Sequence, residues 1–229
     1  MKPHGWWMLP VAVGLFTAGC SPEDEVVLWL RKSPRQFYGL AADVARHLTE
    51  EEHGWRPVER YESWERWERE GRRIRGCEEV LLGFLERKPE ETGFSRWFIA
   101  QALGFVGTEK SVPVLIDIMG DANESEQARS AAVYALGEIA TPGAVRALVE
   151  LVKELEEWPD KAIDELSDEE SGMYSLKVSA LITLASLDDA EARRTVEAEL
   201  RNPGMPERDR QYLKNHLTAP QGEVPPPPG

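Results

Sequence analysis

The side chains of this sequence that could most readily act as nucleophiles, bases or metal ligands are two cysteines and four histidines. The histidines form no set with metal-ligand spacing: they are His4, His47, His53 and His216. The sequence contains no glycine-rich phosphate loop, no strand-turn-helix serine motif and no Cys/His zinc pattern. No nucleophile, base and orienting group can be assembled from it, and catalysis would need such a set or a cofactor. We therefore expect a protein that is not an enzyme and that has no cofactor and no metal.

Cys20 ends an N-terminal segment that has the features of an export signal. A short basic start precedes an apolar run over residues 6–16, which is too short to span a bilayer because a spanning helix takes about 20 residues. Residues 17–19 (Thr-Ala-Gly) lead into Cys20, and this ending resembles the lipobox of bacterial lipoproteins, although Thr17 stands where Leu is usual. The resemblance implies that residues 1–19 are a signal peptide and that Cys20 becomes the lipidated N-terminus. The alternative is an ordinary secretory signal followed by a chance cysteine.

The residue after Cys20 bears on which membrane would hold the protein. In Gram-negative lipoproteins Asp at this position often retains the protein in the inner membrane, so Ser21 favours the outer membrane. Lipid chains contribute about 0.8 kcal/mol per buried methylene, so several chains make a lasting anchor. We expect a protein of the bacterial cell envelope that is anchored to the outer membrane, faces the periplasm and contacts the membrane through its lipid. Residues 20–25 are then predicted to be a tether.

Cys77 begins an apolar helical stretch. A cysteine in such a position is predicted to be a small buried core residue and not a nucleophile. If Cys20 carries lipid, Cys77 is the only remaining thiol, and a disulfide within the chain is impossible.

The 229-residue chain has a formal net charge of -14. A nucleic-acid-binding protein needs a basic footprint, so this charge argues against one. Residues 153–172 concentrate the acidic side chains, with nine carboxylates against two lysines. They lack the alternating ligands and central glycine of a calcium loop, and we expect an acidic insertion made of a lengthened helix and a solvated loop. A metal site and docking to a basic partner are the alternatives.

The centre of the sequence repeats itself with a period of 33 residues. The repeated residues are Arg96, Ala102, Leu103 and Gly104, which return as Arg129, Ala135, Leu136 and Gly137. A fixed period in this range with two helix-length halves is typical of a helical solenoid, whose units bury their apolar faces only against neighbouring units. The sequence therefore predicts an all-α fold, an α-solenoid of about four to five helix pairs with irregular ends.

The repeat divides the chain into segments. The predicted units are residues 77–107, residues 111–140, a third unit that begins at Gly143 and is interrupted by the acidic insertion, and a final pair over residues 190–200 and 207–217. Residues 26–75 are predicted to be N-terminal helices that form an atypical cap, and residues 76–217 the repeat region. Residues 218–229 contain four consecutive prolines and are predicted to be a disordered tail.

The order of features within a unit is an apolar helix, a short acidic turn, an arginine, and an Ala-rich helix ending in Leu-Gly. This order resembles HEAT repeats of the phycobilisome-lyase-like subtype, best over residues 129–139 (RSAAVYALGEI) and convincingly over residues 77–200. The resemblance implies a concave face lined by the second helices. Relatives of this subtype include proteins that attach bilins to partners, but that chemistry is cytoplasmic, whereas the N-terminus of this chain predicts export.

Large aromatic side chains on the concave face are candidate anchors for a partner. The residues predicted to contact a partner are Trp97, Phe105 and Tyr134, together with a basic row of equivalent positions, Arg96, Arg129 and Lys177. The alternative for the basic row is structural: each side chain pairs with carboxylates of the preceding turn, such as Asp121 or Glu126. The sequence thus predicts a non-enzymatic, lipid-anchored scaffold that binds an unidentified protein. A lyase-like or chaperone-like accessory subunit and a structural envelope component are the alternatives.

Overall fold

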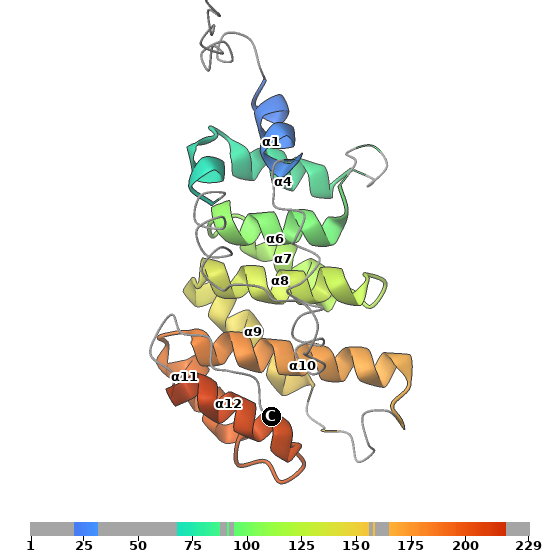
Figure 1. The fold of residues 1–229 in the computed structure, drawn as a ribbon, viewed down its shortest axis with the longest axis vertical. Coiled ribbons are helices and arrows are strands. Elements are labelled where there is room, and N and C mark those ends of the chain that lie inside the picture. The colour runs from blue at the N-terminus through green and yellow to red at the C-terminus, as the bar shows by residue number, and fades with distance from the viewer. Residues whose placement is uncertain are drawn as a thin grey trace, which may run out of the picture.

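The computed structural model describes residues 21–31, 68–87, 91, 94–155, 158 and 165–218. These residues form helices and contain no strand, and neighbouring helices pack as stacked pairs (Figure 1). The predicted all-α, HEAT-like solenoid is therefore confirmed. The predicted signal peptide, Cys20, most of the predicted N-terminal cap and the Pro-rich tail lie outside the described residues.

Three helix pairs and two terminal helices follow one another along the described part of the stack. The helices are α1 (Pro22–Arg31), α4 (Cys77–Leu85), α6 (Arg96–Val106), α7 (Val112–Gly120), α8 (Glu126–Ile139), α9 (Pro142–Glu154), α10 (Asp168–Ser186), α11 (Ala190–Glu199) and α12 (Glu207–Thr218). The pairs are α4 with α6, α7 with α8, and α9 with α10, whereas α11 and α12 each pack mainly against α10. The second helices α6, α8 and α10 lie in consecutive layers, with α8 packed between the other two (Figure 1).

Polar side chains fix where the helices begin. The hydroxyl oxygens of Ser125 and Thr141 accept hydrogen bonds from backbone N–H groups in the first turns of α8 and α9. Pro142 occupies the first position of α9, where its missing N–H costs nothing because that group has no intrahelical acceptor. Ser167 and Glu170 cap each other's backbone N–H groups at the start of α10. A capping side chain and a proline thus define the start of α9.

The repeated glycines allow the second helices to approach one another closely. A Cβ atom placed on Gly104 would lie 3.0 Å from the Cα atom of Ala135, and one placed on Gly137 would lie 2.1 Å from Cγ2 of Thr183. Beside these glycines, Leu103 is fully buried in the shared core, as is its equivalent one repeat later. The Leu-Gly pair therefore combines a core side chain with a position where only hydrogen fits.

The chain is already helical where a tether was predicted over residues 20–25. The hydroxyl oxygen of Ser21 accepts a hydrogen bond from the backbone N–H of Asp24 (3.2 Å), and Oδ2 of Asp24 accepts one from the backbone N–H of Ser21 (3.1 Å). This reciprocal cap starts α1 at Pro22. Trp29 of α1 is buried and lies against Gly71. Residues 22–25 of the predicted tether therefore form the first turn of α1.

The structure describes part of the predicted acidic insertion. Helix α9 ends at Glu154 and α10 begins at Asp168, so α10 includes the last part of the predicted range 153–172. Trp158, within the insertion, is only 6% exposed and contributes its side chain to the core.

Candidate functional site

The predicted basic row turns inward at its first two positions. The Arg96 guanidinium donates hydrogen bonds to the carbonyl oxygen of Leu85 and to Oε1 of Glu124, each at 2.5 Å. Nε of Arg129 donates to the carbonyl oxygen of Met119 at 2.9 Å. Leu85 and Met119 lie in the last turns of α4 and α7, where carbonyl groups have no intrahelical donor. Each arginine therefore caps the first helix of its own unit, which is a structural role, with a carbonyl in the place of the predicted acidic partner of Arg129.

Arg210, which the sequence pattern did not single out, has the same role. Arg210 of α12 donates to the carbonyl oxygens of Leu200, Asn202 and Met205, the last two at 2.9 Å. These carbonyls lie at the end of α11 and just beyond it. The spacing could have identified Arg210, because it follows Leu200 by ten residues, as Arg129 follows Met119.

Lys177 does not continue this row. Its side chain is 2% exposed, its Nζ lies 3.3 Å from Oε2 of Glu199, and the same Nζ lies 4.7 Å from the centroid of the Trp158 ring. The Trp158 ring packs against Lys177 at this position. A side chain buried in this way cannot reach a partner, so we correct the assignment of Lys177 as a contact residue.

Trp158, Lys177 and Glu199 form one buried polar cluster. Nε1 of Trp158 donates a hydrogen bond to Oε2 of Glu199 at 2.8 Å, and the Trp158 ring meets the edge of Tyr174 with 5.9 Å between ring centroids. The Tyr174 hydroxyl donates to Asp209 of α12, and burial together with this carboxylate raises the pKa of Tyr174. Because every charged member has a partner, the cluster offsets part of the cost of removing charges from water.

The predicted aromatic contacts lie on α6 and α8. Trp97, Phe105 and Tyr134 are each half-buried, so their side chains reach the surface without being fully exposed. Trp97 packs edge-on against Phe98, with 5.7 Å between ring centroids. The Tyr134 hydroxyl donates to Oγ of Ser179 on α10 at 3.5 Å, and burial raises the pKa of Tyr134. The structure thus brings these aromatic side chains onto adjacent helices.

Cys77 is buried at the start of α4 and is a free thiol. Burial raises its pKa to about 12, and the neighbouring carboxylates of Glu79 and Glu78 add to this shift. A thiol with such a pKa forms almost no thiolate near neutral pH, and the thiolate is the nucleophilic form. The prediction that Cys77 is a core residue is confirmed.

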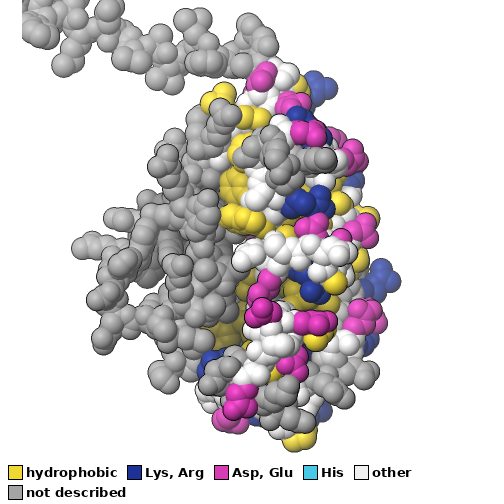
Figure 2. Space-filling model, turned by 90° about the vertical axis from the view of Figure 1, so that its right-hand side faces the viewer, with side chains coloured by type: hydrophobic (Ala, Val, Ile, Leu, Met, Phe, Trp, Pro, Cys, Tyr) yellow, Lys and Arg dark blue, Asp and Glu magenta, His cyan; other side chains and the backbone are white. Residues whose placement is uncertain are grey.

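Acidic side chains are spread over the face of the stack shown in Figure 2, with basic ones between them. Among the described residues no group of three His, Cys, Asp or Glu side chains could hold a metal ion. Within the same residues, no helix is both long enough and apolar enough to cross a bilayer.

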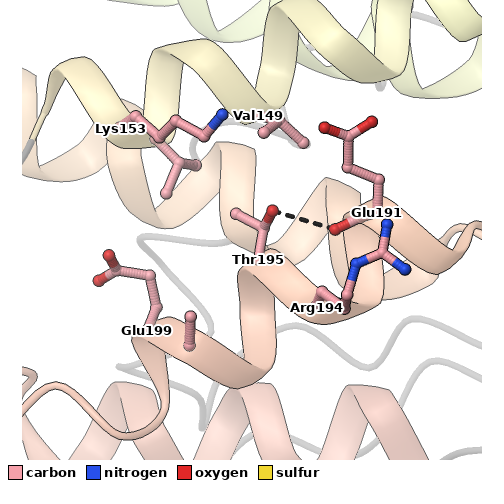
Figure 3. Close-up of a pocket in the computed structure, with 8 residues that line it drawn as sticks. Val149, Lys153, Glu191, Arg194, Thr195 and Glu199 are labelled. Carbon is pink, nitrogen blue, oxygen red and sulfur yellow. Dashed lines mark hydrogen bonds between the residues drawn. The ribbon is translucent and has the colours of Figure 1, made fainter.

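A pocket of about 300 Å³ lies between α9 and α11 (Figure 3). Its apolar lining comes from Val149, Val152 and Ala198, and its charged lining residues are Lys153, Glu191, Arg194 and Glu199. Oγ1 of Thr195 in its wall donates to the carbonyl oxygen of Glu191 at 3.0 Å (Figure 3). Equal numbers of acidic and basic groups surround the pocket, and no nucleophile with a neighbouring base lines it. The lining of the pocket therefore combines apolar side chains with a balanced set of charges.

Comparison with known proteins agrees with this geometry. Residues 79–167 match the family of HEAT repeats, a segment that runs from α4 to the residue before α10. HEAT repeats commonly serve as protein-interaction scaffolds and are typically non-catalytic. No curated protein and no solved structure compared with the chain matches it.

Proposed function

We propose that this protein is a non-enzymatic scaffold that is anchored to a membrane through lipid on Cys20 and binds a partner protein along α6, α8 and α10. The observation that carries the binding proposal is the placement of Trp97, Phe105 and Tyr134. These half-buried aromatic side chains lie on adjacent second helices. Aromatic anchors supply much of the energy of protein interfaces because they bury a large area with few rotatable bonds.

The rigidity of the stack supports the same proposal. Close packing at Gly104 and Gly137 fixes the spacing of α6, α8 and α10, and Arg96 and Arg129 tie α6 to α4 and α8 to α7. A surface that is already ordered loses little conformational entropy when a partner binds. The face formed by the second helices is therefore suited to recognition without rearrangement.

The lipid anchor rests on the resemblance of residues 17–20 to a lipobox. Serine after Cys20 supports an outer-membrane location facing the periplasm, and an exported scaffold would have its partner in the cell envelope. Radiolabelled palmitate fed to producing cells should label the wild-type protein and not the Cys20→Ser variant. Label retained by Cys20→Ser would refute the anchor and leave the binding proposal standing.

The binding proposal is tested by recovering the partner from detergent-solubilised membranes with the tagged full-length protein. We expect Trp97→Ala to reduce recovery of a stoichiometric partner by about tenfold or more, as for an interface anchor. The matched control is Leu28→Ala, which truncates an exposed apolar side chain on α1. Equal recovery with both variants, or no stoichiometric partner with the wild-type protein, would overturn the proposal. Circular dichroism of each variant checks that the fold is intact.

A further inference from the structure

The last two helices, α11 and α12, bury few apolar side chains and are joined by Arg210, which donates to the carbonyl oxygens of Leu200, Asn202 and Met205. The buried apolar side chains are Ala192 and Val196 of α11, Leu213 of α12, and Met205 between the two helices. Helix α8 alone buries six: Ala128, Ala131, Ala132, Val133, Ala135 and Leu136. Burial of apolar area is the main stabilising contribution to folding, so α11 and α12 are held less firmly by it than the central helices.

The boundary between these two helices and the preceding unit is open to solvent in one place. The pocket of about 300 Å³ lies there, between Val149 and Val152 of α9 and Ala198 of α11. Apolar area that faces this pocket is not buried between α9 and α11, so it adds little to their association.

Polar contacts cross the boundary in place of apolar ones. Glu199 of α11 forms an ion pair with Lys177 of α10 and accepts a hydrogen bond from Trp158 of the insertion. Asp209 of α12 accepts a hydrogen bond from Tyr174 of α10. If the pair moved away from α10, Lys177 would lose the carboxylate that compensates its burial, and breaking a buried ion pair is costly.

We propose that α11 and α12 form a hinged C-terminal cap that opens as one unit and is latched by Glu199 through Lys177 and Trp158. Opening frees the insertion at Trp158 at the same time, because both contacts depend on one carboxylate. It uncovers the side of α10 that bears Lys177 and Tyr174 while α6, α7 and α8 stay packed. This device does not depend on the lipid anchor or on the partner site of the second helices.

Native-state hydrogen exchange on the full-length protein tests the cap, because it reports local opening region by region. In the wild-type protein, amides of α11 and α12 should exchange faster than those of α8. Glu199→Gln keeps an acceptor for Trp158 but removes the charge that faces Lys177, and we expect it to speed exchange in α11 and α12 by about tenfold or more. The exchange of α6 and α8 should not change.

Glu197→Gln is the matched control, since Glu197 lies on the same helix, is half-exposed and pairs only loosely with exposed Arg201 at 3.8 Å. It should leave exchange in α11 and α12 within about twofold of wild type. Equal acceleration by both variants, or acceleration spread evenly over all helices, would overturn the proposal. If Glu199→Gln does not fold, Trp158→Phe decides, because it keeps an aromatic ring at this position and removes the donor of the 2.8 Å hydrogen bond to Glu199. Acceleration in α11 and α12 alone supports the latch, whereas uniform or absent acceleration rejects it.

Discussion

Single side chains set the distance between the second helices. Gly137 faces Thr183 so closely that a Cβ atom would lie 2.1 Å from Cγ2, and Thr183 is buried on α10. We expect Gly137→Ala to lower the free energy of unfolding by about 1–3 kcal/mol, because the extra methyl group overpacks the contact between α8 and α10. Urea denaturation measures the change.

Two further variants show whether the loss comes from this contact. Thr183→Ser removes Cγ2, so the double variant Gly137→Ala/Thr183→Ser should regain part of the stability. Gly83→Ala is the control, because no atom lies within 4 Å of its added Cβ and alanine favours the helix by about 1 kcal/mol. A double variant no more stable than Gly137→Ala would show that the strain lies elsewhere.

The arginines illustrate how far single residues could be predicted. The period of 33 residues identified Arg96 and Arg129 as equivalent, and the structure gives both the same kind of acceptor, a carbonyl at the end of the preceding helix. The sequence did not distinguish that acceptor from a nearby carboxylate, because both lie in the same turn. Lys177 was assigned to the same row because of its spacing from Arg129. Its actual environment includes Trp158, and a local sequence pattern does not show that these two residues are in contact.

At the level of elements, a carboxylate joins the first unit to the second. Glu78 of α4 is buried and accepts hydrogen bonds from the backbone N–H of Thr108 at 2.7 Å and from the hydroxyl of Ser111 at 2.7 Å. Both donors lie in the turn that leads into α7. Removing this side chain leaves buried donors without an acceptor, so Glu78→Ala should lower the free energy of unfolding by about 2–3 kcal/mol.

The neighbouring Glu79 supplies the control for this prediction. It is exposed and pairs with exposed Lys110 at 2.9 Å, and exposed pairs of this kind contribute little. Glu79→Ala should therefore change stability far less than Glu78→Ala when both are compared by thermal unfolding. Similar losses for the two variants would show that Glu78 does not join the units.

Helix α12 carries a titrating group. Burial lowers the pKa of His216, although Nδ1 donates a hydrogen bond to the carbonyl oxygen of Tyr212 at 3.1 Å. The unfolded chain then binds a proton more readily than the folded protein as the pH falls below about 6.5. Stability from His216 is thus present above that pH and is lost as the pH falls.

We expect His216→Gln to flatten the pH dependence of unfolding between about pH 5 and 7. Urea denaturation of both proteins at several pH values gives the difference, from which groups common to both cancel. As the pH falls, the free energy of unfolding of the variant should rise relative to that of the wild-type protein. A pH-independent difference would contradict the pKa shift of His216.

Across the whole molecule, the regular centre of the stack was predictable and its exceptions were not. Helices α7, α8 and α9 begin close to the expected residues because their caps, prolines and apolar periodicity are local features. The burial of Trp158 was not predicted, because it depends on Lys177 and Glu199, which lie far along the chain. The sequence named candidate residues of the proposed binding face but not their exposure, because the half-burial of Trp97 follows from tertiary packing.

The cap at Ser21 limits how far the stack could move from a membrane. Ser21 already belongs to the start of α1, so lipid on Cys20 would leave a link of about two residues, which spans no more than roughly 7 Å. A domain on so short a link would stay close to the surface of the bilayer. A partner would then have to come within one molecular length of the bilayer, and the protein would hold it close to the membrane.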